Sequence, residues 1–320
     1  MVNHVYQKSI NGVNMFYEWE DYIVFYTIFS VCAKSADVEV LELCIMYNHF
    51  HGLIRAESVH DLSSFMDRVT AWFVMEHNTH VGRKGKLLKK NYGSAPKWDD
   101  KAVRNAINYI GNNPIEKKLC KRAEEYRWNF LAYAFSRNPF SEPLKKDRAS
   151  KALRKALKEV DYMAEMNLPM KYNLLARLKK NLPEKEIEQL IDYIIVKYLP
   201  FDYQELISYY ESYDTMLTAM HSNTGSEHDI REEWEPESDH AYAEMIRYIR
   251  QSRPGMVVRR VTTLAEAEKA ELAMELQRRT SATYRQICRF LHITPKNSAR
   301  KTADAQVLGD FARPLPTVVD

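Results

Sequence analysis

The first 135 or so residues carry strand-type and helix-type hydrophobic patterns in a fixed order, which restricts the fold more than any other feature. Alternating β-rich residues come first, an unbroken aromatic stretch then indicates a buried helix, and two further β-rich runs indicate a hairpin or a bent strand pair. Two helices follow, separated by a basic loop. The expected elements are strand 4–10, helix 19–34, strands 38–46 and 50–56, a helix opening at Asp61, and helix 99–113. This order predicts an α+β fold with helices packed on an antiparallel sheet.

A polar stretch around Pro139 and Pro143 marks the end of the mixed region, and the sequence beyond it is helical and then acidic. The helices in this second region carry no chemistry that the sequence identifies. We expect an α+β domain 1–137, a helical domain 148–222, an acidic linker and connector 223–262, a helix-turn-helix-like unit 263–308 and a disordered tail 309–320.

Composition excludes several classes of protein. The chain is 45% hydrophobic, enough for folded cores, but its longest strongly apolar run, residues 22–33, is shorter than the about 20 residues that span a bilayer. The N-terminus lacks the basic and apolar regions of a secretion signal. The cysteines at 32, 44, 120 and 288 lie far apart, as expected of buried thiols in a reducing compartment. We therefore expect a cytoplasmic protein with no membrane partner.

The net charge of only +3 conceals two strongly basic regions. Basic residues greatly outnumber acidic ones over residues 82–128, and residues 276–302 contain no acid at all, whereas residues 227–239 are acidic. Two separate basic regions in a near-neutral chain indicate an anionic partner with two contact surfaces.

Two histidines lie two residues apart in one of the predicted strands, as His49-Phe50-His51. Side chains at i and i+2 of a strand point to the same face, so the two imidazoles would lie side by side with Phe50 in the core. Such a pair supplies two ligands of a divalent metal site. The alternative interpretation is a structural pair of histidines in an apolar strand.

The last helix of the mixed region contains Tyr109 and, four residues later, Asn113. This spacing presents a phenol and an amide oxygen on one helical face. Pro114 disfavours a helical conformation at Asn113, so we expect the helix to end or bend there. A tyrosine that only packs in the core is the alternative.

The basic loop between the two helices combines charge with aromatic residues. Its lysines and arginines could neutralise phosphates, and Tyr92 or Trp98 could stack on unpaired bases, although a solvated surface loop has the same composition. The candidate DNA-binding residues here are Arg83, Lys84, Lys86, Lys89, Lys90 and Tyr92.

Together, these groups resemble the single-tyrosine HUH transposases, and among them the REP-associated tyrosine transposases. The resemblance covers residues 3–135. It rests on Met46-x-Asn48-His49-x-His51 followed by Tyr109-Ile110-x-x-Asn113-Pro114-Ile115, with supporting matches in the opening strand, in the first helix and at residues 125–129. Tyr47 stands where the family usually has proline, and Leu88 or Lys89 replaces an aromatic residue that often precedes the tyrosine helix.

The resemblance implies a ferredoxin-like domain that nicks single-stranded, hairpin-flanked DNA and rejoins strands through a 5′-phosphotyrosine. His49, His51 and Asn113 would then hold Mg²⁺ or Mn²⁺, and Tyr109 would be the nucleophile. A nucleoid-associated enzyme is implied, and a homodimer would be in keeping with related transposases that dimerise. The alternatives are a catalytically decayed or domesticated DNA-binding protein or repressor of the same ancestry, and an unrelated helical scaffold.

The second basic region resembles a helix-turn-helix. Two amphipathic helices, 264–278 and 283–291, precede Thr294 and Pro295, which would cap a third, basic helix. This helix could enter the major groove of double-stranded DNA; the alternative is a helical cap on the catalytic domain. The candidate residues are Arg285, Lys296, Asn297, Arg300 and Lys301.

Overall fold

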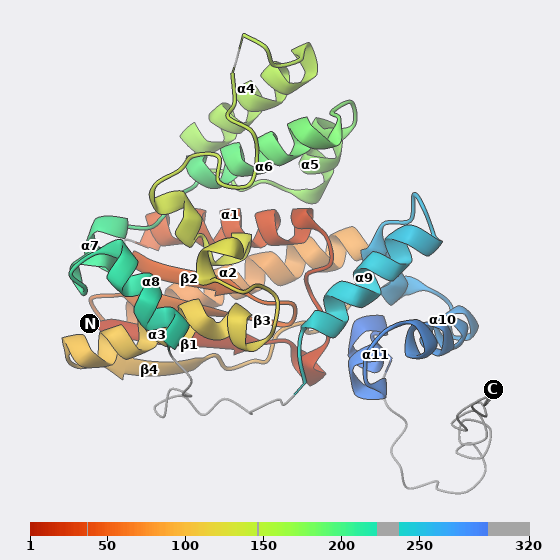
Figure 1. Cartoon of the computed structure of the whole chain (residues 1–320), viewed down its shortest axis with the longest axis horizontal. Coiled ribbons are helices and arrows are strands. Elements are labelled where there is room, and N and C mark those ends of the chain that lie inside the picture. The colour runs from red at the N-terminus through yellow and green to blue at the C-terminus, as the bar shows by residue number, and fades with distance from the viewer. Residues whose placement is uncertain (37, 146, 223–236, 294–320) are drawn as a thin grey trace, which may run out of the picture.

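The computed structural model describes residues 1–36, 38–145, 147–222 and 237–293 (Figure 1). Its centre is a sheet in the order β2-β3-β1-β4, in which every neighbouring pair of strands is antiparallel. The strands are β1 (Val2–Lys8), β2 (Glu39–Ile45), β3 (His49–Arg55) and β4 (Gly93–Lys97). Helix α1 (Trp19–Ala36) connects β1 to β2, and α2 (Val59–Val81) connects β3 to β4. This β-α-β-β-α-β order is that of a ferredoxin-like fold, so the predicted fold class is confirmed.

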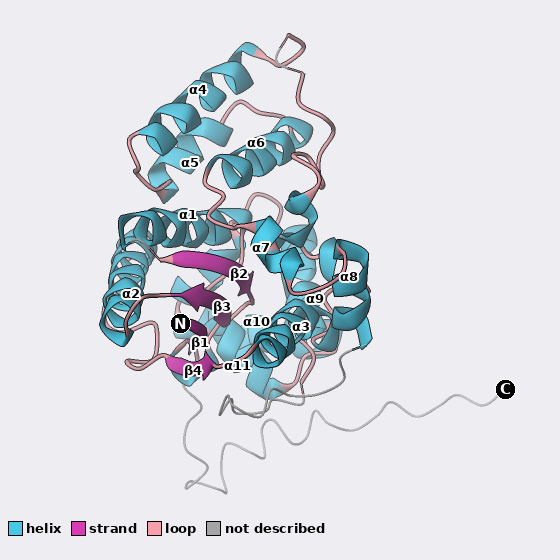
Figure 2. Ribbon diagram, turned by 90° about the vertical axis from the view of Figure 1, so that its left-hand side faces the viewer, coloured by secondary structure: helices cyan, strands magenta, loops and turns pink. Residues whose placement is uncertain are grey.

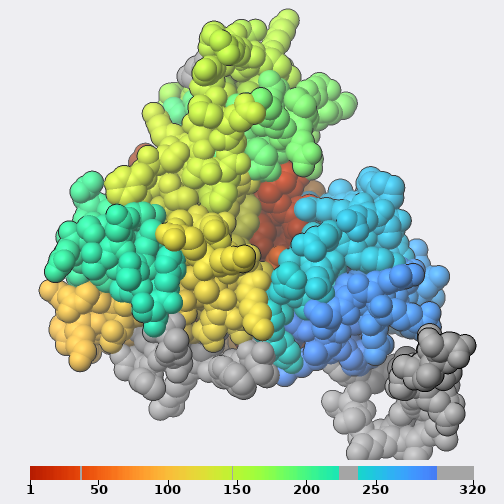
Figure 3. Space-filling model, in the orientation of Figure 1, coloured from red at the N-terminus to blue at the C-terminus, as the bar shows by residue number. Residues whose placement is uncertain are grey.

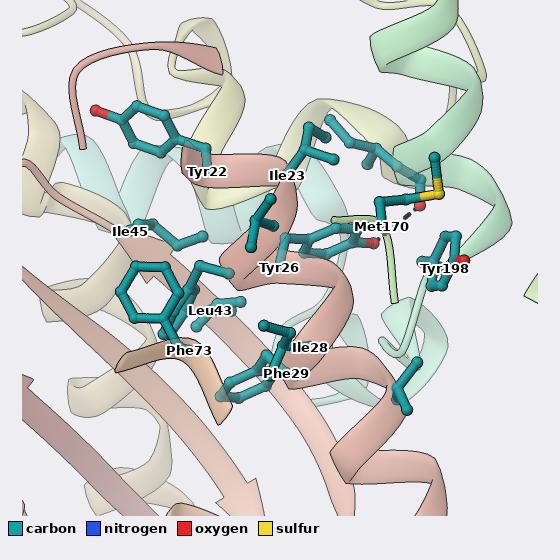
Figure 4. Packing of buried hydrophobic residues seen from close by; sticks show 14 of the residues in the cluster. Tyr22, Ile23, Tyr26, Ile28, Phe29, Leu43, Ile45, Phe73, Met170 and Tyr198 are labelled. Carbon is teal, nitrogen blue, oxygen red and sulfur yellow. Dashed lines mark hydrogen bonds between the residues drawn. The ribbon is translucent and has the colours of Figure 1, made fainter. Parts of the chain in front are cut away.

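Helices α1 and α2 cover one face of the sheet, as Figure 2 shows. The ring centroids of Phe25 and Phe29 of α1 lie 4.6 and 6.4 Å from that of Phe50 of β3. Figure 4 shows Phe29 in this core together with Leu43 and Phe73. Helix α1 is apolar on nearly all sides because other helices cover its outer side too. The Tyr26 hydroxyl donates to the Ile195 carbonyl at 2.9 Å across that second interface.

Helix α3 (Asp100–Glu116) covers the opposite face of the sheet. It continues through Pro114 for three residues beyond Asn113, so the expected end at Asn113 is wrong. Asn113 and Pro114 are both buried, and packing of this last turn overrides the local preference of a residue before proline.

Strand β4 was not expected, because Gly-Ser-Ala-Pro-Lys lacks β-branched residues; its proline is tolerated because β4 is an edge strand.

The helices of region 148–222 divide between the two faces. Helices α4 (Lys151–Glu165), α5 (Tyr172–Lys179) and α6 (Glu184–Lys197) share the hydrophobic core of α1, whereas α7 (Tyr203–Ser208) and α8 (Tyr213–Ser222) share the core under α3. None of the helices in the described residues is long and apolar enough to cross a membrane.

The chain ends, within the described residues, in a small unit that we call the C-terminal unit. It contains α9 (His240–Ser252), the 3₁₀ helix η5 (Val258–Thr263), α10 (Glu266–Arg279) and α11 (Tyr284–Leu291). Helix α9 lies in the segment expected to be linker and connector, where apolar residues at helical spacing follow the acidic run. Figure 3 shows this unit (blue) and α7–α8 (teal) on opposite sides of the segment that follows α3 (yellow). The expected third helix and the tail 309–320 lie outside the described residues.

Candidate active site

Strands β1 and β3 present a row of polar side chains to the face that α3 covers. Tyr6 pairs with His51 and Lys8 with His49 across the antiparallel ladder, and alternation places His4 on the same face. The intervening Val5 and Phe50 point into the core under α1 and α2. This register places both imidazoles on one face of the sheet and Phe50 in the core beneath them, as predicted.

Helix α3 brings Tyr109 to this row. The Tyr109 ring centroid lies 5.6 Å from that of His51 and 5.7 Å from that of His4. Asn113, one turn further along α3, has its amide nitrogen 3.3 Å from His51 Nε2. Side chains about sixty residues apart in the sequence therefore meet at one point on the sheet (the full set is His49, His51, Tyr109 and Asn113).

Hydrogen bonds orient both imidazoles. His49 Nδ1 lies 2.6 Å from Asn48 Oδ1, and the Asn48 amide nitrogen donates to the Gly12 carbonyl at 3.1 Å. His51 Nδ1 lies 3.0 Å from His4 Nε2. Nδ1 of each ring is thus engaged by a neighbouring side chain, which is how metal-binding histidines are typically oriented. Nε2 of His51 is the ring atom that lies next to the Asn113 amide.

The donor atoms at this point fit a divalent cation. The Asn113 side-chain oxygen is buried and has no hydrogen-bond partner among the described residues. Two imidazole nitrogens and an amide oxygen form a donor set that can hold a divalent metal ion. No group of three His, Cys, Asp or Glu side chains in the described residues is arranged to hold a metal ion, so a site here depends on the Asn113 amide.

Helix α3 is held in place from its outer side. The Tyr210 hydroxyl donates to Asn108 Oδ1 at 2.8 Å, next to Tyr109 in the sequence. Gly111 lies so close to α8 that an added Cβ would come within 2.5 Å of the Met220 sulfur. At the start of the helix, the Asp99 carboxylate accepts from the Ala102 amide at 2.7 Å. The position of Tyr109 is thus set by packing on both sides of its helix.

Residues 9–113 match the family model described as Transposase IS200 like. We call these matched residues the transposase domain, after the family that they resemble. The chain is also similar to a solved structure described as a REP-associated tyrosine transposase bound to a REP hairpin, at 14% identity and a TM-score of 0.36, over 47% of this chain and 87% of that one. No curated protein matches the chain significantly.

The transposase domain carries Tyr47 at the position where a proline is expected. Its backbone carbonyl accepts from the Met15 and Phe16 amides at 2.8 and 3.2 Å, and its ring lies 5.5 Å from that of Tyr242 in α9. Burial is the main cause that raises the pKa of the Tyr47 phenol above its usual value. The substitution therefore builds an interface to the C-terminal unit and leaves the catalytic candidates untouched.

The candidate residues of the basic loop of the transposase domain have different surroundings. The Arg83 guanidinium folds the loop on itself, because it donates to Asn78 Oδ1 at 3.1 Å and to the Lys86 carbonyl at 2.7 Å. The Tyr92 hydroxyl lies 3.0 Å from Ser63 Oγ of α2, on the face of the sheet opposite to the histidines. Tyr92 is thus not placed to stack on DNA at this site. The remaining candidates are exposed lysines, at positions 84, 86, 89 and 90.

Helix α11 of the C-terminal unit packs against the transposase domain, as the alternative of a helical cap expects. The Tyr17 hydroxyl donates to the Phe290 carbonyl at 2.7 Å, and a Cβ on Gly12 would come within 2.9 Å of Arg289 Nε. Gly12 adopts φ +68°, which also favours glycine there. Arg285 is exposed, whereas the other candidates of this region (Lys296, Asn297, Arg300 and Lys301) lie outside the described residues.

Sequence reasoning missed the residues around the predicted four. His4, Tyr6 and Lys8 share the face of the histidines, and Asn48 orients His49. The alternation of residues 4–10 was visible as a strand signal. Which of its two faces meets the histidines depends on the pairing register, which the sequence does not state.

Proposed function

We propose that this chain is a metal-dependent, single-strand-specific DNA nickase and strand transferase of the transposase type. The observation that supports it is the meeting of Tyr109, from α3, with the paired histidines of β3. The proposed substrate is single-stranded DNA flanked by a hairpin, as in the REP-associated family that the motifs resemble. A homodimer, and contact of the C-terminal region with double-stranded DNA, stay predictions.

The proposed metal ligands are His49, His51 and Asn113. A bound Mg²⁺ or Mn²⁺ supplies Lewis-acid chemistry at the phosphate, which offsets the charge that develops in the transition state. Asn48 and His4 engage Nδ1 of the two imidazoles, so Nε2 of each ring is the proposed ligand atom. Lys8 lies opposite His49 on the same face of the sheet and adds positive charge to the site where a phosphate would bind.

The proposed chemistry is an exchange of phosphodiester bonds. The Tyr109 oxygen loses its proton and forms a bond to phosphorus. The bond from phosphorus to the 3′ oxygen breaks, and that oxygen leaves with the electron pair and gains a proton. The products are a 5′-phosphotyrosine and a free 3′-hydroxyl. Because the phosphodiester energy is conserved, another 3′-hydroxyl can reverse the step and join a new strand.

A nicking assay tests this function. The substrate is an end-labelled pool of hairpin oligonucleotides with random single-stranded flanks, incubated with Mg²⁺, with Mn²⁺ or with EDTA. We expect cleavage by the wild-type chain only with metal, and none by Tyr109→Phe, because the phenyl ring has no attacking oxygen.

Tyr126→Phe is the matched control. Tyr126 belongs to the same hydrophobic cluster, but its hydroxyl donates to the Ile45 carbonyl at 2.8 Å, and burial raises the pKa of its phenol above the usual value. We expect this variant to cleave. Cleavage by Tyr109→Phe would contradict the nucleophile, and binding without cleavage by the wild type would favour the decayed DNA-binding protein.

A further inference from the structure

Tyr6 occupies a special position on the sheet beside the candidate active site. It lies between His51 of β3 and Gly93 of β4, each directly opposite it in the ladder. A Cβ added to Gly93 would come within 1.9 Å of Tyr6 Cε1 and 2.5 Å of Cδ1. The phenol ring of Tyr6 therefore rests directly on the backbone of β4, in the space that any other residue at position 93 would fill.

The Tyr6 ring lies next to the His51 ring on the same face of the sheet. Its centroid lies 6.0 Å from that of His51, with 23° between the two ring planes. Tyr6 is partly exposed, whereas His51 beside it is buried. A strand whose phosphate reaches Tyr109 and the histidines must therefore pass next to this ring.

The other aromatic residues of this edge are less well placed. The Tyr92 hydroxyl is tied to Ser63 on the far face of the sheet. Trp98 is 79% exposed but lies past the end of β4. The last residue of β4, Lys97, pairs with Val2, which is already two pairs beyond His4. Among the described aromatic residues of β1, β4 and the basic loop, Tyr6 alone combines exposure with a place beside His51.

We propose that the Tyr6 ring, seated on Gly93, stacks on the nucleobase next to the phosphate that Tyr109 attacks. The inference rests on the proposed function and names a contact that positions its substrate. Every base has an aromatic face, so such a contact tolerates any sequence and fixes where the strand lies. Loss of one stacked base weakens binding by about 10- to 100-fold.

Photocrosslinking tests the contact directly. The probe is a hairpin oligonucleotide with thymidine flanks that carries 5-iododeoxyuridine at one flank position at a time. The protein carries Tyr109→Phe, so that binding is measured without cleavage. We expect a crosslink at one or two adjacent positions, mapped by mass spectrometry to the peptide that contains Tyr6.

Three substitutions separate stacking from a structural role. Tyr6→Phe keeps the ring and should keep affinity for the probe. Tyr6→Leu keeps apolar bulk without an aromatic face, and Gly93→Val displaces the ring, so each should weaken binding about 10- to 100-fold. Trp98→Leu is the matched control and should change little. Mn²⁺ affinity should be the same with and without Tyr6→Leu in the Tyr109→Phe protein. A substitution that disrupted the fold of the site would lower Mn²⁺ affinity as well.

The outcomes distinguish this inference from the proposed function. Wild-type cleavage together with unchanged binding and KM in Tyr6→Leu would overturn the stacking contact alone. A crosslink to Tyr6 without any metal-dependent cleavage would overturn the nickase and leave the contact standing. Crosslinks that map only to other residues would also overturn it.

Discussion

At the scale of single residues, the candidate site depends on side chains that orient other side chains. The Asn48 amide lies between His49 Nδ1, at 2.6 Å, and the Gly12 carbonyl, at 3.1 Å. His4 holds His51 in the same way, at 3.0 Å. Partners of this kind fix the tautomer and the direction of a metal-binding imidazole.

Asn48→Ala should therefore weaken metal binding. We expect Mn²⁺ affinity to fall about 10- to 100-fold, because the His49 ring loses the acceptor that fixes its orientation. Mn²⁺ titration of the purified chain, followed by electron paramagnetic resonance, measures it. Asn14→Ala is the control: Asn14 is also fully buried nearby, but its side chain makes no hydrogen bond with the described residues. An equal loss of affinity in both variants would argue against the orienting role.

The sequence was enough to single out the two histidines, Tyr109 and Asn113, because their order and spacing resemble those of the single-tyrosine transposases. Side-chain periodicity alone left a structural pair of histidines and a packing tyrosine as alternatives. The sequence was not enough to find His4 or Tyr6. Their place beside His51 follows from the register of β1 against β3, which long-range pairing decides. The contact of Tyr92 with Ser63 of α2 was not foreseen either, because strand β4, which begins directly after Tyr92, was not expected.

At the scale of elements, the tyrosine-bearing helix α3 lies between the sheet and α8. Gly111 faces Met220 at a separation that leaves no room for a Cβ. Helix α8 thus has a role that its own sequence did not reveal, because it packs on the outer side of the tyrosine-bearing helix. Apolar periodicity predicted that this segment is helical, but periodicity carries no information on which face it covers.

Overpacking of Gly111→Ala against the buried Met220 should cost about 1–3 kcal/mol, of which the higher helix propensity of alanine offsets about 1 kcal/mol. Shortening the facing side chain should relieve this, so the double variant with Met220→Ala should cost less than the sum of the two single variants. Urea unfolding of the four proteins measures the coupling. Strict additivity would show that the two residues do not press on each other.

At the scale of the whole molecule, three parts of the chain meet at Asp21 near the start of α1. Its carboxylate accepts from the Tyr17 and Glu18 amides at 2.9 and 2.8 Å and from the Tyr172 hydroxyl of α5 at 2.9 Å. It also forms a buried ion pair with Arg259 of η5. The transposase domain, the α4–α6 helices and the C-terminal unit thus share one buried polar cluster.

Asp21→Asn should leave the Arg259 guanidinium buried without its counter-charge. Breaking a buried pair in this way costs about 3–5 kcal/mol, which should appear as a large fall in the urea midpoint. Arg177 and Glu159 form an exposed ion pair between α5 and α4, and Glu159→Gln should cost about 1 kcal/mol or less. Equal effects of the two substitutions would contradict the central role of Asp21.

Acid should also destabilise the whole molecule. Burial is the main cause that lowers the pKa of His77 and of His292 to about 4 each. The unfolded chain, with histidines near their usual value, binds more protons between about pH 4 and 6.5, so stability is full above this window and falls through it as pH decreases. The loss is on the order of 1 kcal/mol per histidine and pH unit.

Thermal unfolding at a series of pH values checks this window. His77→Phe removes one of the two groups and fits a buried site beside Phe73. Its Tm should depend less on pH between 4 and 6.5 than that of the wild type. An unchanged slope would show that His77 does not contribute.

In the proposed reaction a phenol, two imidazoles and an amide act together on one phosphate, and isolation of the covalent intermediate is the decisive experiment. Wild-type protein is incubated with the hairpin pool and Mn²⁺, denatured and digested, and the nucleotide-bearing peptide is sequenced by mass spectrometry. We expect one adduct, on Tyr109, formed with Mn²⁺ and absent with EDTA or in His49→Ala. An adduct on another residue, or one that forms equally well in His49→Ala, would contradict it.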